Sequence, residues 1–301
     1  MKKKKIYIAG CGGMLGEAFY KVFSKKYKLK CTDINLNEKW LFYLDFRKFK
    51  KYFSDVKIFK PNYLIHLGAN TDLEFCEKNK KKTYKTNTTS VIYAIKISNK
   101  LRIPLIYIST AGIFDGKKKS YDDWDKPKPL GQYAKTKYLG EFFIQKYSWK
   151  YLICRAGWMM GGGPKKDKKF VQKIISQIKT GCKELFIVND KLGTPTYTYD
   201  FAKNLKLLIE KKQWGLFNMV CSGVTSRINV AKEICKNLNL QHKIKINKVK
   251  SSYWKKIYFA ARPNSERLIN RKLNLKRLNI MRNWKICLRE YIKKYYLENI
   301  I

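Results

Sequence analysis

A cluster of glycines between a short apolar run and a helical pattern constrains the fold of this chain more than any other feature. Residues 5–9 are β-type and mostly apolar, and apolar side chains recur at helical spacing from residue 15 to residue 23. Between them the chain reads Gly10-Cys11-Gly12-Gly13-Met14-Leu15-Gly16. In such a strand–turn–helix, Gly10, Gly13 and Gly16 permit a tight turn, close approach of a pyrophosphate and close helix–strand packing. The helix N-terminus offers free N–H groups to the anion. We therefore expect a dinucleotide site, with an ordinary βα loop as the weaker alternative.

Strand and helix patterns alternate through the first half of the chain. Predicted strands cover residues 5–9, 29–34, 61–69, 104–110 and 151–155, and predicted helices cover 89–100 and 132–147, with a further helical stretch beginning at Asp45. Repeated strand–helix units with apolar strands are typical of a parallel sheet covered on both faces. The sequence therefore predicts an α/β fold: a Rossmann-type doubly wound parallel sheet with a smaller C-terminal substrate-binding domain.

The pattern changes after Trp158. A loop rich in glycine and lysine is expected at residues 161–169, helices at 170–179, 228–238 and 284–297, and strands at 185–188 and 215–220. We expect residues 1–155 to form the NAD(P)-binding Rossmann domain, with a return to it around 197–222. Residues 156–301 are expected to form mainly the substrate-binding domain.

The charge of the chain bears on its partners. The formal net charge is +44, which would attract nucleic acid or other anionic surfaces. The excess is nearly all lysine and is spread through every segment, whereas arginine, the residue that reads bases, is sparse. We therefore expect anionic small substrates and no specific nucleic-acid binding, with a nucleic-acid-binding protein kept as an alternative. The oligomeric state is open, and a homodimer is one alternative.

Cysteine usage and hydropathy indicate a cytoplasmic protein without a membrane span. The cysteines are scattered with no C-x-x-C pair, and several, such as Cys154, lie in apolar runs. Buried free thiols are therefore expected in place of disulfides or a zinc site, and no metal ligands are assigned. No apolar run approaches the roughly 20 residues of a transmembrane helix. The basic start at residues 1–5 resembles the n-region of a signal peptide, but glycines soon interrupt the run after it, so we interpret that run as a strand.

Residues at the predicted strand ends suit a dinucleotide. Asp33 stands near the end of the second strand, about 20 positions beyond the glycines, where a carboxylate can accept hydrogen bonds from an adenosine ribose. A surface aspartate at a strand end is the alternative. The third strand ends in the small residues Gly68 and Ala69, which allow a cofactor to lie over the carboxyl edge of the sheet. Asp33 favours NAD(H), while nearby lysines favour NADP(H) weakly, so both cofactors stay open.

A Tyr-x-x-x-Lys pair supplies a candidate for proton transfer. Tyr133 and Lys137 are one turn apart on a predicted helix, and a lysine cation can lower the pKa of a tyrosine toward working pH. Tyr199 and Lys203 have the same spacing, but they receive no role. Only Tyr133 follows the strand that ends in Ser109-Thr110 at an interval that lets both meet above the sheet edge.

Several segments together resemble the extended short-chain dehydrogenase/reductase superfamily, and within it the dTDP-4-dehydrorhamnose reductase-like group. The resemblance covers nearly the whole chain. Its motifs lie at residues 10–16, 108–116, 133–141, 155–158, 188–196 and 261–265. The last three are the most particular, because a Rossmann fold does not require them, and they look like parts of a nucleotide-sugar pocket.

The resemblance implies a role for each candidate residue. Tyr133 would be the general acid, Lys137 would hold the nicotinamide ribose and tune Tyr133, and Thr110, with Ser109 as its rival, would hydrogen-bond the substrate carbonyl. The implied cofactor-binding residues are Gly10, Gly13, Met14, Leu15, Gly16, Asp33, Ile34, Asp45, Phe46, Leu67, Gly68, Ala69, Ser109, Tyr133 and Lys137. The implied substrate-binding residues are Trp158, Thr194, Pro195 and Arg262, with Arg262 suited to a diphosphate. Plain packing is the alternative for Trp158 and Pro195.

The implied function is an NAD(P)H-dependent reductase that acts on a keto group of a nucleotide-activated deoxysugar, in deoxysugar and cell-surface polysaccharide biosynthesis. The chain departs from the rhamnose-type pattern, because Ala111 and Gly112 stand where Asp-Tyr usually follows the threonine. This weakens the assignment to one particular sugar. It also argues against 4,6-dehydration, since neither residue can move a proton. Two alternatives stay open: an NAD-dependent nucleotide-sugar epimerase and a non-catalytic regulatory subunit of the same fold.

Overall fold

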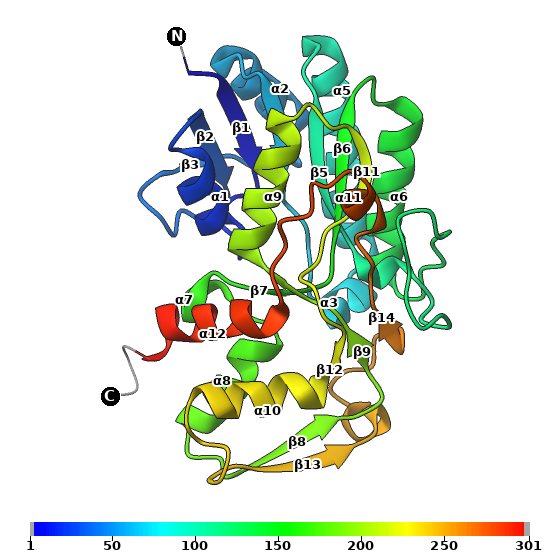
Figure 1. The fold of residues 1–301 in the computed structure, drawn as a ribbon. Helices are drawn as coiled ribbons and strands as arrows, with labels where there is room; N and C mark the ends of the chain where they lie inside the picture. Colours follow the sequence, from blue (N-terminus) through cyan, green and yellow to red (C-terminus); the bar gives the residue numbers. More distant parts are fainter. Residues whose placement is uncertain (1–2, 298–301) are drawn as a thin grey trace.

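A seven-stranded parallel sheet forms the centre of the computed structural model, which describes residues 3–297 (Figure 1). The outermost positions of the expected domains, residues 1–2 and 298–301, lie outside that range. The strand order is β11-β6-β5-β4-β1-β2-β3. The strands are β1 (Lys5–Ala9), β2 (Lys28–Asp33), β3 (Leu41–Tyr43), β4 (Tyr63–His66), β5 (Leu105–Thr110), β6 (Tyr151–Ala156) and β11 (Gly215–Asn218). The order reverses beside β1, which confirms the doubly wound Rossmann-type fold.

Side chains that alternate along the strands pack into two separate hydrophobic cores, one on each face of the sheet. On one face, Ile6 and Ile8 pack in a cluster with Phe19 of α1 and Phe201 of α9. On the other face, Tyr7 packs in a cluster with residues of the helices α2, α5 and α6. The bounds of these helices are α1 (Gly16–Phe23), α2 (Phe49–Phe59), α5 (Ser90–Leu101), α6 (Gln132–Tyr147) and α9 (Thr198–Glu210). The period-2 alternation of a parallel strand with two covered faces explains why the β1 run reads as almost continuously apolar.

Short elements connect these units at the edge of the sheet where the strands end. They are α3 (Leu73–Lys78), α4 (Lys80–Tyr84), the π-helix η1 (Lys85–Thr89) and the 3-10 helix η2 (Ala111–Ile113). The π-helix runs directly into α5, so the predicted helix at 89–100 is the end of a longer helical segment.

A smaller part built from later residues lies at the carboxyl edge of the sheet, below it in Figure 1. The helices of this smaller part are α7 (Gly163–Lys166), α8 (Phe170–Lys179), α10 (Arg227–Asn237) and α12 (Trp284–Tyr295), with the 3-10 helix η3 (Ser251–Trp254), whereas α11 (Arg271–Leu275) lies beside the central sheet (Figure 1). The strands of the smaller part are β7 (Trp158–Met160), β8 (Glu184–Val188), β9 (Leu192–Gly193), β10 (Pro195–Tyr197), β12 (Thr225–Ser226), β13 (Lys245–Val249) and β14 (Ser265–Glu266). Of these helices, α11 contacts strand β11 of the central sheet.

One strand was not predicted, and the predicted start of one helix was wrong. Leu41–Tyr43 forms the edge strand β3, although no strand was expected there, because three residues are too few to show a period. The helical stretch expected from Asp45 begins instead at Phe49. Asp45 Oδ1 accepts hydrogen bonds from the backbone N–H and the Nε of Arg47, at 2.9 and 2.8 Å, and this local pairing holds the segment in a turn.

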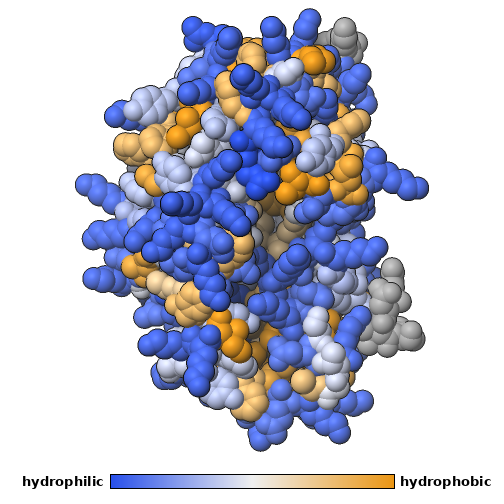
Figure 2. Space-filling view, turned by 180° about the vertical axis from the view of Figure 1, so that it is seen from behind, coloured by the Kyte–Doolittle hydropathy of each residue, from blue (hydrophilic) through white to orange (hydrophobic). Residues whose placement is uncertain are grey.

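Most of the thiols are buried, as the sequence predicts. Cys182 is exposed, and the other cysteines are buried and free. Cys221 Sγ and Cys287 Sγ are 3.7 Å apart without a bond between them. No helix within residues 3–297 is long and apolar enough to cross a membrane. Hydrophilic side chains dominate the face shown in Figure 2, which has a hollow near its middle.

Candidate active site

The glycine turn packs so closely that two of its glycines accept no side chain. Gly10 has φ +80°, and a Cβ there would stand 2.3 Å from the Gly68 Cα. A Cβ on Gly16 would stand 1.6 Å from the Cys11 carbonyl oxygen. By contrast, a Cβ on Gly13 would meet no atom within 4 Å, so the Gly13 side of the turn faces open space. The turn is therefore fixed by strand and helix on one side and accessible to an anion on the other.

Asp33 points toward this turn. Its Oδ2 accepts a hydrogen bond from the Gly12 N–H at 2.9 Å, and its Oδ1 accepts one from the Asn35 N–H at 2.9 Å. A Cβ on Gly12 would stand 2.7 Å from the Asp33 Cγ. The carboxylate therefore lies beside the phosphate-binding turn, as the ribose-binding prediction requires, while the neighbouring Ile34 is 43% exposed.

The ends of β3 and β4 close the next part of the expected cofactor cleft. The Phe46 ring lies so near Gly68 that a Cβ on Gly68 would stand 2.2 Å from its Cε1. Leu67 donates its N–H to the Ala9 carbonyl at 2.8 Å, which ties the β4 end to β1. Asp45 borders a hollow of about 300 Å³ that basic side chains surround. The lining residues are Asp45, Arg47, Lys48, Lys82, Lys85 and Thr86. A dinucleotide carries negative charge, so this charge distribution suits it.

Ser109 adds an observation in favour of a bound cofactor. Its side chain is 4% exposed, and its Oγ is buried without a hydrogen-bond partner among the described residues. A buried hydroxyl without a partner costs free energy unless a ligand or water supplies one. Ser109 lies at the carboxyl end of β5 beside Thr110. The glycine turn, Asp33 and this hydroxyl together fit a nicotinamide dinucleotide.

Thr110 and Tyr133 meet above the end of β5, as the sequence predicts. The Thr110 Oγ1 accepts a hydrogen bond from the Gly112 N–H at 3.1 Å, and the hydroxyl also hydrogen-bonds Tyr133. Burial raises the pKa of the Tyr133 hydroxyl well above its usual value, and the bond with Thr110 offsets part of the rise. Tyr133 therefore stays protonated at neutral pH and is available as a proton donor.

Lys137 lies one turn further along the same helix and is buried. Its Nζ donates a hydrogen bond to the Ile108 carbonyl at 2.7 Å and lies 4.0 Å from the centroid of the Tyr107 ring. Burial lowers the pKa of Lys137 to about 7, and the charge of Glu141 opposes this shift. Burial dominates the pKa of Tyr133 and raises it, and the role of Lys137 in tuning that pKa stays a prediction.

Residues that sequence reasoning missed hold the helix α6 in place. Glu77 Oε1 accepts a hydrogen bond from the Gln132 N–H at 2.6 Å and so caps the helix just before Tyr133. Asn87, in the π-helix, donates to Thr136 Oγ1 at 3.2 Å and bonds the backbone of Asn70. π-helical turns are frequent at functional sites. Glu77 and Asn87 are single polar residues within helical segments, and nothing in the sequence around them predicts these contacts.

A buried ion pair fixes α6 to the sheet. Glu141 of α6 and Arg155 of β6 are 0% and 3% exposed, and Arg155 Nη2 lies 2.8 Å from Glu141 Oε2. Arg155 Nε adds a second bond to Glu141 Oε1 at 3.0 Å. Both residues belong to the motifs noted in the sequence, although no role was assigned to them.

The predicted substrate residues divide into two groups. Thr194 and Pro195 are buried; the Thr194 Oγ1 accepts a hydrogen bond from the Leu268 N–H at 3.3 Å, and Pro195 pairs with Trp158 between β10 and β7. Arg262 is partly exposed, and its Nη2 forms an ion pair with Glu74 at 2.7 Å. Trp158 is partly exposed. Their contacts with a substrate stay predictions.

Two charged residues that the sequence did not mark surround Trp158. Glu266 Oε2 accepts a hydrogen bond from Trp158 Nε1 at 2.6 Å. The Arg227 guanidinium lies 3.6 Å from the centre of the Trp158 ring, and burial lowers the pKa of Arg227 to about 10. The residues come from positions far apart in the sequence, so no local pattern could have brought them together.

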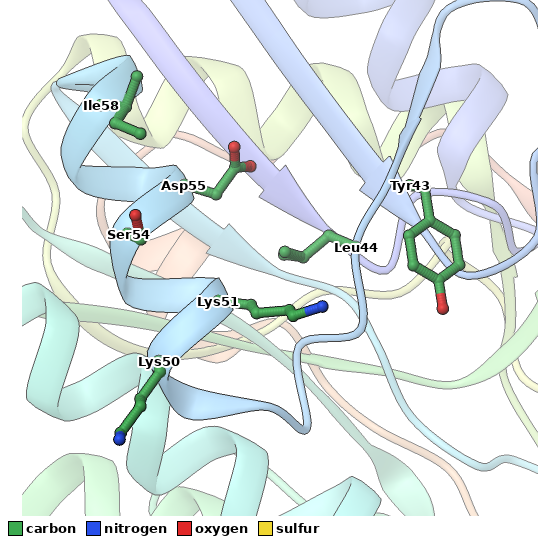
Figure 3. A pocket seen from close by; sticks show the side chains of 7 residues that line it. All are labelled: Tyr43, Leu44, Lys50, Lys51, Ser54, Asp55 and Ile58. Carbon is green, nitrogen blue, oxygen red and sulfur yellow. The ribbon is translucent and has the colours of Figure 1, made fainter.

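A second pocket lies away from these residues. It has a volume of about 430 Å³ and opens between α2 and the segment after β3 (Figure 3). Its lining residues are Tyr43, Leu44, Lys50, Lys51, Ser54, Asp55 and Ile58. The Asp55 carboxylate is already engaged by the Tyr7 hydroxyl and by Lys30 Nζ, each at 2.5 Å. None of the residues predicted to bind cofactor or substrate lines it.

One group of side chains in the described range has metal-ligand chemistry. Asp200, Cys221 and Cys287 are buried, and their ligand atoms lie within 4.8 Å of one another. Asp200 pairs with Arg282, whose Nη2 lies 2.6 Å from the Asp200 Oδ1. That cation already balances the carboxylate, so we assign no metal to this group.

A doubly wound sheet that ends in this constellation defines the class of the protein: an NAD(P)-dependent oxidoreductase of the extended short-chain dehydrogenase/reductase type. The family model described as RmlD substrate binding domain matches residues 4–297. The chain belongs to this family.

Similar proteins agree with the family. Spore coat polysaccharide biosynthesis protein SpsK of Bacillus subtilis (strain 168) is 28% identical over 292 residues, which are 96% of this chain and 97% of SpsK. The solved dTDP-4-dehydrorhamnose reductase of Yersinia enterocolitica is 31% identical with a TM-score of 0.85, covering 97% of this chain and 100% of that chain. The dTDP-4-dehydrorhamnose reductase of Bacillus anthracis, solved in complex with NADP, is 26% identical with a TM-score of 0.88 over 97% and 100% of the two chains.

Proposed function

We propose that this protein reduces a keto group on a nucleotide-activated deoxysugar with NAD(P)H. The observation that carries the proposal is the convergence of Thr110 and Tyr133 at the carboxyl end of β5, with Lys137 buried one helical turn further along α6. The solved relatives named dTDP-4-dehydrorhamnose reductase support the substrate class. The relative named for spore coat polysaccharide biosynthesis supports a role in surface polysaccharides.

The reaction divides between cofactor and protein. When bound, the reduced nicotinamide supplies a hydride. Thr110 and Tyr133 present hydroxyls to the carbonyl oxygen and so stabilise the negative charge that develops there. Tyr133 then donates its proton to that oxygen, which its raised pKa permits because the hydroxyl is protonated at neutral pH. We infer that Lys137, whose Nζ now donates to the Ile108 carbonyl, binds the ribose next to the nicotinamide, and that the unpartnered hydroxyl of Ser109 hydrogen-bonds the cofactor.

The remaining expectations stay predictions. They are the division into a cofactor-binding part (1–155, returning at 197–222) and a substrate-binding part (156–301), a cytoplasmic location, a homodimer and the lack of specific nucleic-acid binding. Arg262 can bind a diphosphate only if its ion pair with Glu74 is at least partly broken.

A direct assay tests the proposal. The purified chain is mixed with dTDP-4-dehydrorhamnose and either NADH or NADPH, and cofactor oxidation is compared with sugar reduction. We expect both in equal amounts. Conversion of a sugar to its epimer without net cofactor oxidation would show an epimerase. Cofactor binding without conversion of any nucleotide sugar would favour the regulatory-subunit alternative.

A further inference from the structure

Glu266 is an acidic side chain at the site that the proposed reaction does not yet use. It is the second residue of β14, which pairs with β9 so that Glu266 stands opposite Gly193. Its Oε1 lies 3.4 Å from the point where a Cβ on Gly112 would stand, and the Thr110 Oγ1 lies 3.5 Å from the same point. A carboxylate from the C-terminal part and the proposed carbonyl-binding hydroxyl therefore border the same small space.

The two oxygens of this carboxylate have different surroundings. Oε2 accepts the Trp158 Nε1–H at 2.6 Å, which fixes the orientation of the group. Oε1 makes no hydrogen bond to any residue between 3 and 297. The side chain is only partly exposed. A charged oxygen held in a partly buried place requires a donor, from water or from a ligand.

The charge of Glu266 acts on Tyr133, the proposed proton donor. Its negative charge contributes to the raised pKa of Tyr133. Arg227 and Lys191 also interact with Glu266, and their positive charges offset the repulsion that a lone carboxylate would exert on an anionic substrate. Lys191 is itself held by Asn264 Oδ1 at 2.7 Å.

The residues after Thr110 leave room for this arrangement. Ala111 and Gly112 have no side chain that could reach a substrate with a polar atom. A side chain longer than Cβ at Gly112 would enter the space between Thr110 and Glu266, because both already lie within 3.5 Å of the Cβ position. The small residues and the carboxylate therefore form one feature, although they are far apart in the sequence.

We propose that Glu266 positions the substrate by accepting a hydrogen bond at Oε1 from a hydroxyl on the ring carbon next to the keto carbon. This inference rests on the proposed function. When Thr110 binds the carbonyl oxygen, substituents of the neighbouring ring carbon are the groups closest to the space beside Gly112. A carboxylate only accepts hydrogen bonds, so it selects a sugar with a donor on that carbon and disfavours one that lacks the hydroxyl there. Glu266 is thus a specificity-determining residue.

The test compares two substrates in matched variants. The full chain is assayed with saturating cofactor on dTDP-4-dehydrorhamnose and on the analogue that lacks the hydroxyl next to the carbonyl. In the unmutated protein we expect kcat/KM to be about 10- to 100-fold higher for the hydroxylated sugar, the range for a hydrogen bond to a charged group. Glu266→Leu should lower kcat/KM for the hydroxylated sugar alone and bring the ratio close to one. Glu184→Leu, which removes an exposed carboxylate from β8, should leave the ratio unchanged.

The remaining outcomes separate the role of Glu266 from the proposed function. An unmutated protein that treats both sugars alike, or a Glu266→Leu variant that keeps the ratio, overturns the role of Glu266. If Glu266→Leu does not fold, as judged by thermal unfolding, Glu266→Gln carries the test. Its uncharged oxygen should reduce the ratio to roughly 2- to 10-fold, the range for a neutral hydrogen bond, and an unchanged ratio again overturns the role. No turnover of either sugar by the unmutated protein overturns the proposed function, and this inference with it.

Discussion

At the scale of single residues, Lys137 shows how two opposing effects act on one ammonium group. Burial removes water from the group and disfavours its charge, while the nearby Glu141 carboxylate favours it. Burial dominates, so the pKa of Lys137 falls from 10.5 to about 7. Its Nζ donates a hydrogen bond to the Ile108 carbonyl. In the folded protein without cofactor, the side chain therefore loses its proton near neutral pH.

This shift predicts a pH dependence of stability. Between pH 7 and 10.5 the unfolded chain binds more protons at Lys137 than the folded chain, so the free energy of unfolding rises with pH across that window. Urea unfolding of the cofactor-free protein at pH 6.5 and pH 9 should show this gain in the unmutated chain. Lys137→Met should lack it. Equal pH dependence of the two proteins would contradict the shifted pKa.

Asp33 yields a prediction about cofactor choice. Its carboxylate lies beside the glycine turn, where it can accept both ribose hydroxyls of NADH and repels a 2′-phosphate. One nearby cation, Lys30, is already paired with Asp55 at 2.5 Å, which reduces its attraction for that phosphate. We expect NADH to be used at least as well as NADPH, and Asp33→Ala to shift the preference toward NADPH.

Steady-state kinetics with both cofactors at low and high salt measure this preference. Exposed lysines act over a screened distance, so any help they give NADPH should fade at high salt. A strong NADPH preference of the unmutated protein that persists at high salt would show that another residue governs the choice.

At the scale of elements, the position of α6 depends on contacts with three other segments. Glu77 of α3 caps its first turn, Asn87 of the π-helix binds Thr136, and Arg155 of β6 pairs with Glu141. These contacts surround the turn that carries Tyr133 and Lys137. The geometry of the proposed acid is therefore set by polar contacts as well as by apolar packing.

The Glu141–Arg155 pair gives a prediction at this scale. Glu141→Gln would leave the Arg155 charge buried without its partner, which should lower the free energy of unfolding by about 3 to 5 kcal/mol. Replacing both, as Glu141→Leu with Arg155→Met, should recover most of that loss, because no buried charge remains. Urea unfolding of the two variants makes the comparison. A Glu141→Gln protein as stable as the unmutated one would contradict the importance of the pair.

Several elements and one contact of the site could be predicted from the sequence. The helices Gln132–Tyr147 and Phe170–Lys179 begin and end at the predicted residues. The meeting of Thr110 and Tyr133 also follows from the sequence, because a helix that follows a parallel strand begins at the edge of the sheet where that strand ends. The strand Leu41–Tyr43 was too short to show a pattern. Glu266, Arg227 and Glu77 could not be found, because their contacts join segments that are distant along the chain.

At the scale of the whole molecule, several polar contacts join the central sheet and the smaller part. Arg262 pairs with Glu74 at 2.7 Å, Lys169 Nζ donates to the Thr71 carbonyl at 2.7 Å, and Lys166 pairs with Glu38 at 2.7 Å. Each joins a later segment to the carboxyl edge of the sheet. The contacts lie on the side where cofactor and substrate are expected, so we expect ligand binding to be linked to the joining of the two parts.

Glu74 tests that link. The Glu74–Arg262 pair is partly exposed and should contribute no more than about 1 kcal/mol to stability. Glu74→Gln should therefore change the unfolding temperature little, while the freed Arg262 lowers the KM for the nucleotide sugar by up to about fivefold. Arg262→Gln should raise that KM. If KM is the same in both variants, Arg262 has no part in binding the diphosphate.

The central claim is that Tyr133 donates the proton in a hydride-transfer reaction, and one variant tests it most directly. The turnover of Tyr133→Phe is measured with NAD(P)H and dTDP-4-dehydrorhamnose, beside its affinity for the cofactor. We expect unchanged cofactor affinity and a turnover reduced by roughly 10² to 10⁴, the range for the loss of a general acid. Turnover close to that of the unmutated protein would contradict it.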